Sequence, residues 1–398
     1  MALPNLPEDV IQTKILPLLP IKSLMRFRSV CKSWKSLFFE SGFINSHHNY
    51  CTSQNPDNDD QHLIINRLVP GSHKRKYYDI DACHNYNNIA MLSLSDLSKT
   101  ELFDVPRSQR STKARMNLLS SLIHLLGSIN GLVCLYVTKL GYFLLWNPAT
   151  RQAKKFKRPQ WYNVGCWRDG DFFGFCWNEL ENDFQVVVCY TDRCFHEFKI
   201  FSSHVYSCNS GSWSSKFIKL PGFKHRPRTD SKVPSAIVNG VPYWNFSFCS
   251  RKPSVIKFEV QSKEFRELPA FKYGVERGQN EFLNVSWKGS LAVLTSTRSQ
   301  DFCVNVYIFD ERNGIWSKTF IVGPVRTRVD KLSACFKRGG EIVFHTHEEY
   351  MCYDHKTEQI ERLGNQEGRL LGGFSYKATL VFLKGMKPLH KVQPLFWN

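Results

Sequence analysis

The feature that most constrains the fold is a repeated β-hairpin pattern in the body of the chain. Each copy starts at an aromatic residue and has a small polar residue four positions later and an apolar residue three positions after that. Its strand, polar turn and second strand predict a hairpin. The five copies are Trp146–Thr150–Ala153, Tyr206–Ser210–Trp213, Phe258–Ser262–Phe265, Phe309–Asn313–Trp316 and Tyr353–Thr357–Ile360.

A further strand precedes four of these hairpins, as a short apolar run that follows Gly131, Gly240, Gly289 or Gly340. A unit of at least three strands therefore repeats every forty-four to sixty residues, which is the period of a β-propeller blade. With a weaker unit at 92–105, the pattern predicts a six- or seven-bladed β-propeller, and a two-sheet β-sandwich is the alternative. Residues 62–68 and 376–383 are the expected strands that close the ring, the first against the last.

The repeated aromatic residues are expected to form the core between blades, because a fixed position in each blade is what packing requires. Target recognition is expected in the long insertions between strands, at 106–113, 161–170, 223–234 and 272–279. These insertions hold aromatic and cationic residues of the types that anchor protein interfaces. The predicted target-binding residues are Trp161, Tyr162, Trp167, Arg168, Arg226 and Arg228.

One apolar stretch, Met116 to Thr138, contains no Asp, Glu, Lys or Arg and is long enough to span a bilayer. In lipid, however, Asn117, His124 and Asn130 would lie unpaired, and Asn130-Gly131 is a turn signal. We therefore interpret the stretch as two buried strands and expect no membrane segment.

The chain carries 53 lysines and arginines against 35 acidic residues, a net charge of +18. This balance indicates a partner with an acidic surface or a nucleic acid. The basic clusters at 73–78, 154–158 and 224–228 are short, and no nucleic-acid-binding motif accompanies them. We interpret them as solvated charge in loops, and we expect no nucleic-acid partner.

The thirteen cysteines are an odd number without regular spacing, and the first residues carry no apolar run of the kind found in secretory leaders. We therefore expect reduced thiols in the cytoplasm or the nucleus. Cys189, Cys194 and His196 lie close together in the sequence, and His345 and His347 could join them. Their spacing is not that of a zinc site, and no GxSxG, HExxH or Walker motif occurs. We expect no catalytic residues, no metal and no cofactor.

The first forty residues differ from the body and predict three short helices. Pro7 suits the first turn of the first helix, Pro17 and Pro20 are expected to end it, a second helix starts at Ile21, and a third follows Val30. So small a unit cannot bury its many large apolar side chains alone. These helices therefore either cap the propeller or dock on another protein.

The segments LPED, LPIKSL and RFRSVCKSW in this region resemble the F-box of plant F-box proteins. The body resembles the F-box-associated, kelch-like domain of the same family in NGLVCL, LLWNPATRQAKKF, VYSCNSGSWS, VNGVPYW, FRELP and IWSKTF. Two positions depart from the F-box pattern: Lys14 stands where an acidic residue is usual, and Pro17 lies where the first helix commonly continues.

The resemblance implies a non-catalytic substrate receptor of an SCF E3 ubiquitin ligase. Its F-box would bind the adaptor protein that links it to cullin, and its propeller would capture a target protein for ubiquitination. The implied adaptor contacts are Leu6, Pro7, Ile11, Ile15, Leu16, Pro20, Leu24, Val30, Cys31 and Trp34. The alternatives are a scaffold that binds the adaptor without ubiquitination and a free-standing propeller that recognises acidic or polyanionic partners.

The expected organisation is thus an α+β multidomain chain. It consists of an F-box domain at 1–47, a linker at 48–61, an F-box-associated propeller at 62–390 and a C-terminal tail at 391–398.

Overall fold

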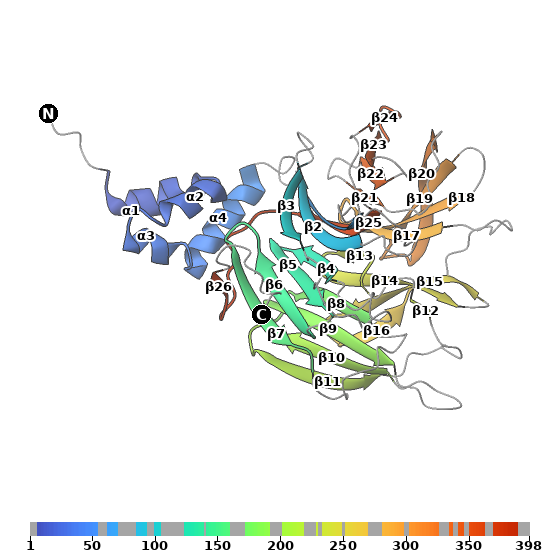
Figure 1. Ribbon diagram of the computed structural model, residues 1–398, viewed down its shortest axis with the longest axis horizontal. Coiled ribbons are helices and arrows are strands. Elements are labelled where there is room, and N and C mark those ends of the chain that lie inside the picture. Colours follow the sequence, from blue (N-terminus) through green and yellow to red (C-terminus); the bar gives the residue numbers. More distant parts are fainter. Residues whose placement is uncertain are drawn as a thin grey trace, which may run out of the picture.

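The computed structural model shows a helical head attached to a ring of six β-sheets (Figure 1). The described residues are 6–54, 62–70, 85–93, 99–104, 123–138, 141–159, 172–191, 201–218, 228–229, 233–248, 251–269, 281–297, 302–325, 334–336, 341–345, 350–362 and 369–388.

The head, residues 6–54, contains one more helix than the sequence predicts. Its elements are α1 (Glu8–Val10), the π-helical η1 (Ile11–Ile15), the 3-10 helical η2 (Leu16–Leu18), α2 (Ile21–Phe27), α3 (Lys32–Leu37) and α4 (Ser41–Gln54). The fourth helix, α4, covers residues 48–54, where we expected a linker. Its apolar residues Phe43 and Ile44 pack on the other helices, which explains why the helical region continues past residue 47.

Pro17 does not end the first helical run, contrary to expectation. The run passes from α1 through η1 and η2 to Leu18. The backbone changes from π-helical turns in η1 to a 3-10 turn in η2, and Pro17 lies in the first turn of η2, where no N–H donor is required. The run ends before Pro20, where Leu19 is extended with φ −84° and ψ 146°, as the residue before a proline should be.

Six antiparallel sheets form the blades of the ring. Blade 1 consists of β4 (Ile123–Ile129), β5 (Leu132–Val137), β6 (Tyr142–Asn147) and β7 (Gln152–Lys157). Blade 2 consists of β8 (Phe172–Asn178), β9 (Asp183–Thr191), β10 (Phe201–Ser207) and β11 (Ser212–Ile218). Blade 3 consists of β12 (Arg228–Thr229), β13 (Ala236–Val238), β14 (Val241–Phe248), β15 (Arg251–Glu259) and β16 (Glu264–Glu267).

Blade 4 consists of β17 (Glu281–Trp287), β18 (Ser290–Thr297), β19 (Phe302–Asp310) and β20 (Ile315–Val325). Blade 5 consists of β21 (Ala334–Phe336), β22 (Ile342–His345), β23 (Tyr350–Asp354) and β24 (Gln359–Arg362). Blade 6 consists of β25 (Arg369–Tyr376), β1 (His62–Pro70), β2 (Asn85–Ser93) and β3 (Lys99–Asp104). The five predicted hairpins are the outer two strands of blades 1 to 5, and the blade count is six.

The ring closes in blade 6, where strands from the two ends of the chain pair. Strand β25 lies antiparallel to β1, with Leu63 opposite Ser375 and Ile65 opposite Gly373. The first strand was predicted correctly, but its partner is 369–376 and not 376–383. Residues after Tyr376 cannot continue the ladder because β1 begins at His62, which is already opposite Tyr376.

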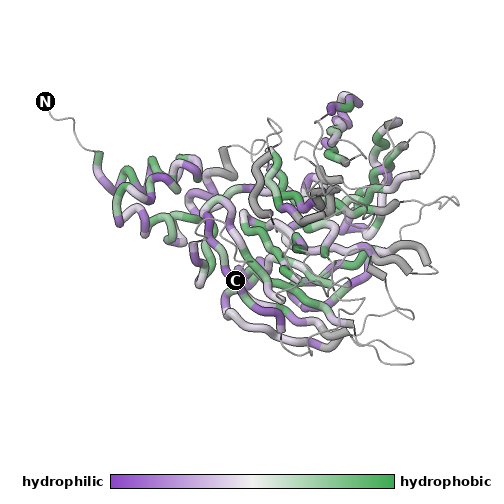
Figure 2. The backbone as a smooth tube through the Cα atoms, viewed as in Figure 1, coloured by the Kyte–Doolittle hydropathy of each residue, from purple (hydrophilic) through white to green (hydrophobic). Residues whose placement is uncertain are grey.

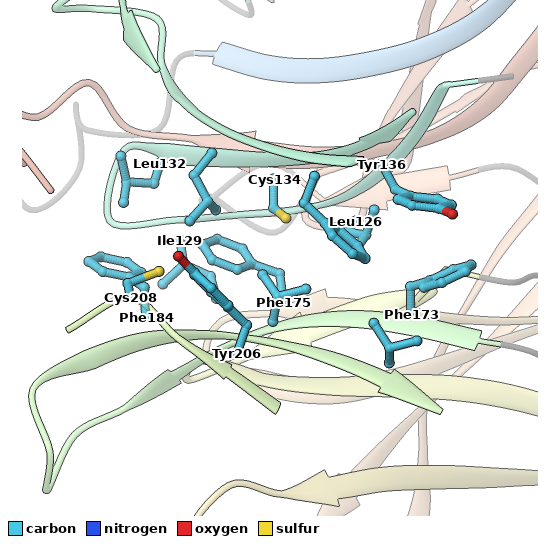
Figure 3. Packing of buried hydrophobic residues seen from close by; sticks show 14 of the residues in the cluster. Leu126, Ile129, Leu132, Cys134, Tyr136, Phe173, Phe175, Phe184, Tyr206 and Cys208 are labelled. Carbon is cyan, nitrogen blue, oxygen red and sulfur yellow. The ribbon is translucent and has the colours of Figure 1, made fainter. Parts of the chain in front are cut away.

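The core lies between neighbouring blades, as the repeated aromatic residues predict. Tyr206 of blade 2 is 4% exposed and stacks on Phe156 of blade 1, with ring centroids 3.8 Å apart. It belongs to one apolar cluster with Leu132 and Tyr136 of blade 1, and Figure 3 shows this interface. The other four repeat aromatics are buried against the preceding blade in the same way: Trp146, Phe258, Phe309 and Tyr353. In Figure 2 the hydrophobic stretches accordingly follow the strands of the ring.

The apolar stretch that could have spanned a membrane instead forms the two inner strands of blade 1. Strands β4 and β5 are joined by a tight turn at Asn130-Gly131, with φ values of 47° and 77°, so the predicted turn and buried strands are confirmed for the described residues 123–138. Within the described part of the chain, no helix has the length and apolar character needed to cross a bilayer.

The ring has two different faces. On the turn face the first strand passes to the second in blades 1 to 5, and in every blade the third passes to the fourth, by short turns such as 130–131 and 148–151. On the opposite loop face the second strand passes to the third, and the chain crosses to the next blade. Since β1 starts and β25 ends beside each other, the chain enters and leaves the ring on the turn face.

The chain leaves the ring through a C-terminal strap, residues 377–386, which crosses the turn face of blade 1. Thr379 Oγ1 donates a hydrogen bond to the Asn130 carbonyl (2.7 Å), and Asn147 Nδ2 donates to the carbonyls of Thr379 (3.0 Å) and Val381 (2.9 Å). After the strap, β26 (Lys387–Pro388) adds to β7 as a fifth strand of blade 1. The strap therefore lies between the ring and the head.

Candidate interaction surfaces

The head is built around a small core that the strap completes. Leu16, Leu24, Phe38 and Phe43 are buried there together with Leu380 of the strap, and Leu380 is only 2% exposed. Leu16 and Leu24 were predicted to contact the adaptor, but they are 1% and 0% exposed. They instead hold the helices together, because a head of this size needs its few central leucines for its own core.

Aromatic and cationic side chains form the seam between head and strap. Phe39 packs edge to face on Phe382 of the strap, with ring centroids 5.1 Å apart, and the Arg28 guanidinium lies 4.6 Å from the Phe39 ring centroid. Burial lowers the pKa of Arg28. His47 is buried, its Nε2 lies 3.0 Å from the Leu19 carbonyl oxygen, and burial lowers its pKa. The head is therefore docked on the ring as a cap.

Glu8 ties the first helical run to α3. Its Oε1 accepts hydrogen bonds from Trp34 Nε1 (2.7 Å) and Gln12 Nε2 (2.9 Å), and these bonds, that from Gln12 foremost, lower the pKa of Glu8. The Trp34 ring also packs against Phe27 at 5.8 Å. The hydrogen bond between Trp34 and Glu8 places residues 6–8 and residues 30–34 at the same end of the head.

The head nevertheless exposes large apolar side chains. Leu6 is 60% exposed, Val30 61%, Leu18 49% and Ile15 37%. They are four of the eight large hydrophobic residues that are exposed in the described part of the chain. Since a folded monomer scatters such residues over its surface, their concentration on 49 residues, 6–54, indicates a binding surface.

The remaining predicted adaptor contacts have atoms at the surface of the head. Pro7, Pro20 and Cys31 are exposed, whereas Ile11 and Trp34 are half-buried. Their contact with an adaptor stays a prediction. We did not predict Leu18 as a surface residue of the head. Its position between Pro17 and Pro20 was the available signal, because the prolines favour a tight turn in which Leu18 points away from the buried Leu16.

The charged side chains that the head exposes between residues 10 and 39 are all basic. Lys14, Lys22, Arg26, Lys32 and Lys35 are exposed, and no acidic residue lies between Asp9 and Glu40 in the sequence. A partner of the head would therefore combine apolar pockets with an acidic rim.

The predicted target-binding residues lie almost entirely outside the described residues. This holds for Trp161, Tyr162, Trp167, Arg168 and Arg226, and Arg228 is described only as part of strand β12. The insertion at 161–170 lies in the sequence between β7, which ends at Lys157, and β8, which begins at Phe172. Both of these strand ends are on the loop face. The strap and the head lie on the opposite, turn face of the ring.

No metal site forms among the described residues, where three or more His, Cys, Asp or Glu side chains nowhere come together in a suitable group. Cys189 is buried in the core between blades 2 and 3, and His345 ends β22. The other members of the cluster considered from the sequence, Cys194, His196 and His347, lie outside the described residues.

Two protein-family models match the chain. The model described as "F-box domain" matches residues 3–44, and the model described as "F-box associated beta propeller domain" matches residues 84–380. The first match covers most of the head. The second match covers well over half of the chain, from just before β2 into the strap.

Curated relatives share this pattern at low identity. The Arabidopsis thaliana F-box/kelch-repeat protein At3g23880 is 25% identical over 268 residues, which cover 67% of this chain and 65% of the relative. The chain thus spans slightly less than two thirds of that relative's length. The F-box protein At1g30790 from the same plant is 21% identical over 384 residues, 90% of this chain and 89% of the relative.

Among solved structures, the ring is similar to the β-propeller domain of the Trilobed protease from Pyrococcus furiosus. The TM-score is 0.40 at 11% identity, over 76% of this chain and 80% of the other. A likeness at this level supports no inference about function.

Proposed function

Because the chain belongs to the plant-type F-box proteins that carry an F-box-associated β-propeller domain, we propose that it is the substrate-recognition subunit of an SCF E3 ubiquitin ligase. In this proposal the head binds the adaptor, and through it cullin, while the loop face of the propeller captures a target protein for ubiquitination. The protein then works in the cytoplasm or the nucleus.

The observation that carries the proposal is the exposed apolar surface of the head. Leu6 and Val30 are each about 60% exposed, and the Glu8–Trp34 hydrogen bond holds their segments together at one end. Apolar side chains presented by short helices suit a groove on another protein. The strap fixes the other side of the head to the ring, so the free side remains available.

The two faces of the ring support a receptor that performs no bond chemistry. The head lies on the turn face, and the inter-blade connections emerge on the loop face. A target held there would be kept at a fixed distance from the rest of the ligase. The contribution of the protein would be the effective concentration of the target's lysines near a conjugating enzyme.

The test is isothermal titration calorimetry of the full chain with the SCF adaptor, using a double variant Leu6→Asp and Val30→Asp. Both side chains are exposed, so the variant should fold. Buried apolar contacts often account for most of the binding energy, and we expect a loss of affinity of about a hundredfold, or roughly 2.8 kcal/mol.

The matched control is Leu180→Asp with Ile315→Asp, two exposed apolar residues of the ring that are 77% and 58% exposed. It should leave adaptor affinity within about twofold of wild type, because neither residue touches the head. If wild type and both variants bind equally well, or if the folded wild type does not bind, the receptor proposal is wrong. The last outcome would favour a free-standing recognition propeller.

A further inference from the structure

We expected the basic cluster at 154–158 to lie in a loop, but most of it lies in a strand. Residues Lys154 to Lys157 belong to β7, the fourth strand of blade 1. Strand geometry separates their side chains, since successive residues point to opposite faces. Lys155 and Lys157 share the face of Ala153, which packs against blade 6, whereas Lys154 turns to blade 2 and donates to the Cys208 carbonyl at 3.2 Å.

The chain adds a third lysine to this face from a distant part of the sequence. Lys387 of β26 is paired directly with Ala153. Directly opposed residues of an antiparallel pair share one face, so Lys387 lies on the same face as Lys155 and Lys157. We call these three residues the lysine row, and all three are exposed.

The positive charge of this row is not neutralised within the described part of the chain. Neither the lysine row nor its exposed neighbours Arg151 and Lys384 forms an ion pair with a described residue.

One lysine in blade 2 and one in blade 3 do have acidic partners. Lys216 of β11 binds Glu264 at 2.7 Å, and Lys257 of β15 binds Glu259 at 2.9 Å. Blade 1 therefore differs from blades 2 and 3 because two lysines on one face of its strand β7 form no ion pair with a described residue.

We propose that the lysine row binds an extended, acidic polypeptide segment along the outer edge of blade 1. Lysines two positions apart on a strand are separated by about 6.6 to 6.8 Å. An extended peptide with Asp or Glu at every second position repeats its carboxylates at the same spacing. Such a segment would place one carboxylate on Lys155 and one on Lys157. Its next acidic side chain toward the turn face lies within reach of Lys387, which is diagonal to Lys155 on the neighbouring strand β26.

The aromatic residues beside the row favour a peptide over a nucleic acid. Single-stranded nucleic acids bind where bases can stack on open rings. Tyr142 is 2% exposed and is covered by Lys155 Nζ at 3.8 Å from its ring centroid, and Phe156 is stacked on Tyr206 at 3.8 Å. No ring among these residues offers an open face.

The row is separate from the apolar surface proposed to bind the adaptor. It starts at the turn face, where Lys387 is paired next to the turn at 148–151, and ends at Lys157 toward the loop face; β7 and β26 are labelled in Figure 1. The inference goes beyond the proposed function and does not require it. Its test contains no adaptor, so the two can fail independently.

The test measures the binding of a fluorescein-labelled peptide of alternating Glu and Ser to the full chain by fluorescence anisotropy. The variant is Lys155→Glu, Lys157→Glu and Lys387→Glu, and the control is Lys288→Glu, Lys318→Glu and Lys356→Glu, which changes the net charge equally at exposed sites elsewhere. We expect the first to lose at least about tenfold in affinity and the control less than about threefold. Circular dichroism checks folding, and the glutamine triple variant at the row replaces the glutamate one if the latter unfolds.

Three outcomes would overturn the proposal. The wild type does not bind the peptide even at low salt, the two triple variants lose affinity equally, or a single-stranded RNA of equal length binds the row more tightly than the peptide. The second outcome would show an effect of net charge alone, and the third would make the row a polyanion site.

Discussion

The head and the ring are stabilised in opposite ways. Each blade of the ring is covered by a neighbour on both faces, and six apolar clusters lie between blades. The head has a single cluster, one member of which is supplied by the strap. A closed ring buries its own apolar surface, whereas this head remains open to a further partner. The following predictions test this difference, from the largest expected effect to the smallest.

Trp244→Ala should destabilise the ring most strongly. Trp244 is 0% exposed, packs on Phe172 and Phe265 at 5.4 and 5.7 Å, and donates from Nε1 to the Phe173 carbonyl at 3.1 Å. Removing it leaves a cavity between blades 2 and 3 and should cost about 3 to 5 kcal/mol of the free energy of unfolding. Urea denaturation followed by far-UV circular dichroism measures this. A loss below about 1 kcal/mol would contradict the closed-ring interpretation.

Leu380→Ala should destabilise the head and leave the ring nearly intact. Leu380 completes the core around Leu16 and Leu24, so its truncation should cost about 2 to 4 kcal/mol locally. Hydrogen exchange should rise in 8–54 and not in β5 or β9. Leu180→Ala, at a residue 77% exposed, is the control and should change neither region. A uniform rise across the chain would show that the head is not a separate unit.

Gly131→Ala should loosen the strap. Gly131 has φ +77°, and a Cβ there would overlap the Thr379 side chain and lie 2.9 Å from the Lys377 carbonyl. The backbone strain at residue 131 and the displacement of Thr379 should together destabilise the docked strap by about 1 to 3 kcal/mol. The loss should appear as faster hydrogen exchange in 377–383. Gly211→Ala is the matched control, because it has φ +68° but its Cβ meets only the Tyr206 hydroxyl, at 3.8 Å. Equal effects of both substitutions on the strap would rule out the steric explanation.

Acid should weaken the head, with the smallest effect of the four. Burial lowers the pKa of His47 below 6.5 in the folded head. The unfolded state therefore takes up a proton first, and stability that is complete above pH 6.5 is lost as the pH falls through the lowered pKa. Hydrogen exchange of the head, corrected for intrinsic rates at each pH, should show this loss, and His47→Gln should remove it. An unchanged pH dependence in the variant would assign the effect to another group.

The ring could be predicted from the sequence because its strands repeat one local pattern. Trp146, Tyr206 and their counterparts occupy the same position in each blade, and each is buried against the preceding blade. The end of the ring could not be predicted this way. Both 369–376 and 376–383 are apolar enough to be strands, and only the pairing of Tyr376 with His62 decides between them.

The surface of the head could be predicted only in part. Leu6 and Val30 are exposed as expected, but Leu16 and Leu24 have the same residue type and lie inside. What decides their burial is Leu380, more than 350 residues away in the sequence. The lysine row escaped prediction for a similar reason, because Lys387 joins Lys155 only through the pairing of β26 with β7. Local patterns do not contain such long-range contacts.

The closure of the ring by β1 and β25 has a consequence for synthesis on the ribosome. Strands β1 to β3 emerge early, but their inner partner β25 and the core residue Leu380 are among the last parts to be translated. A nascent chain that stops before residue 369 lacks both, so its blade 6 keeps an open edge and its head keeps an incomplete core. Only a chain translated through the strap can present a finished head, which makes premature termination products poor competitors for any partner of the head.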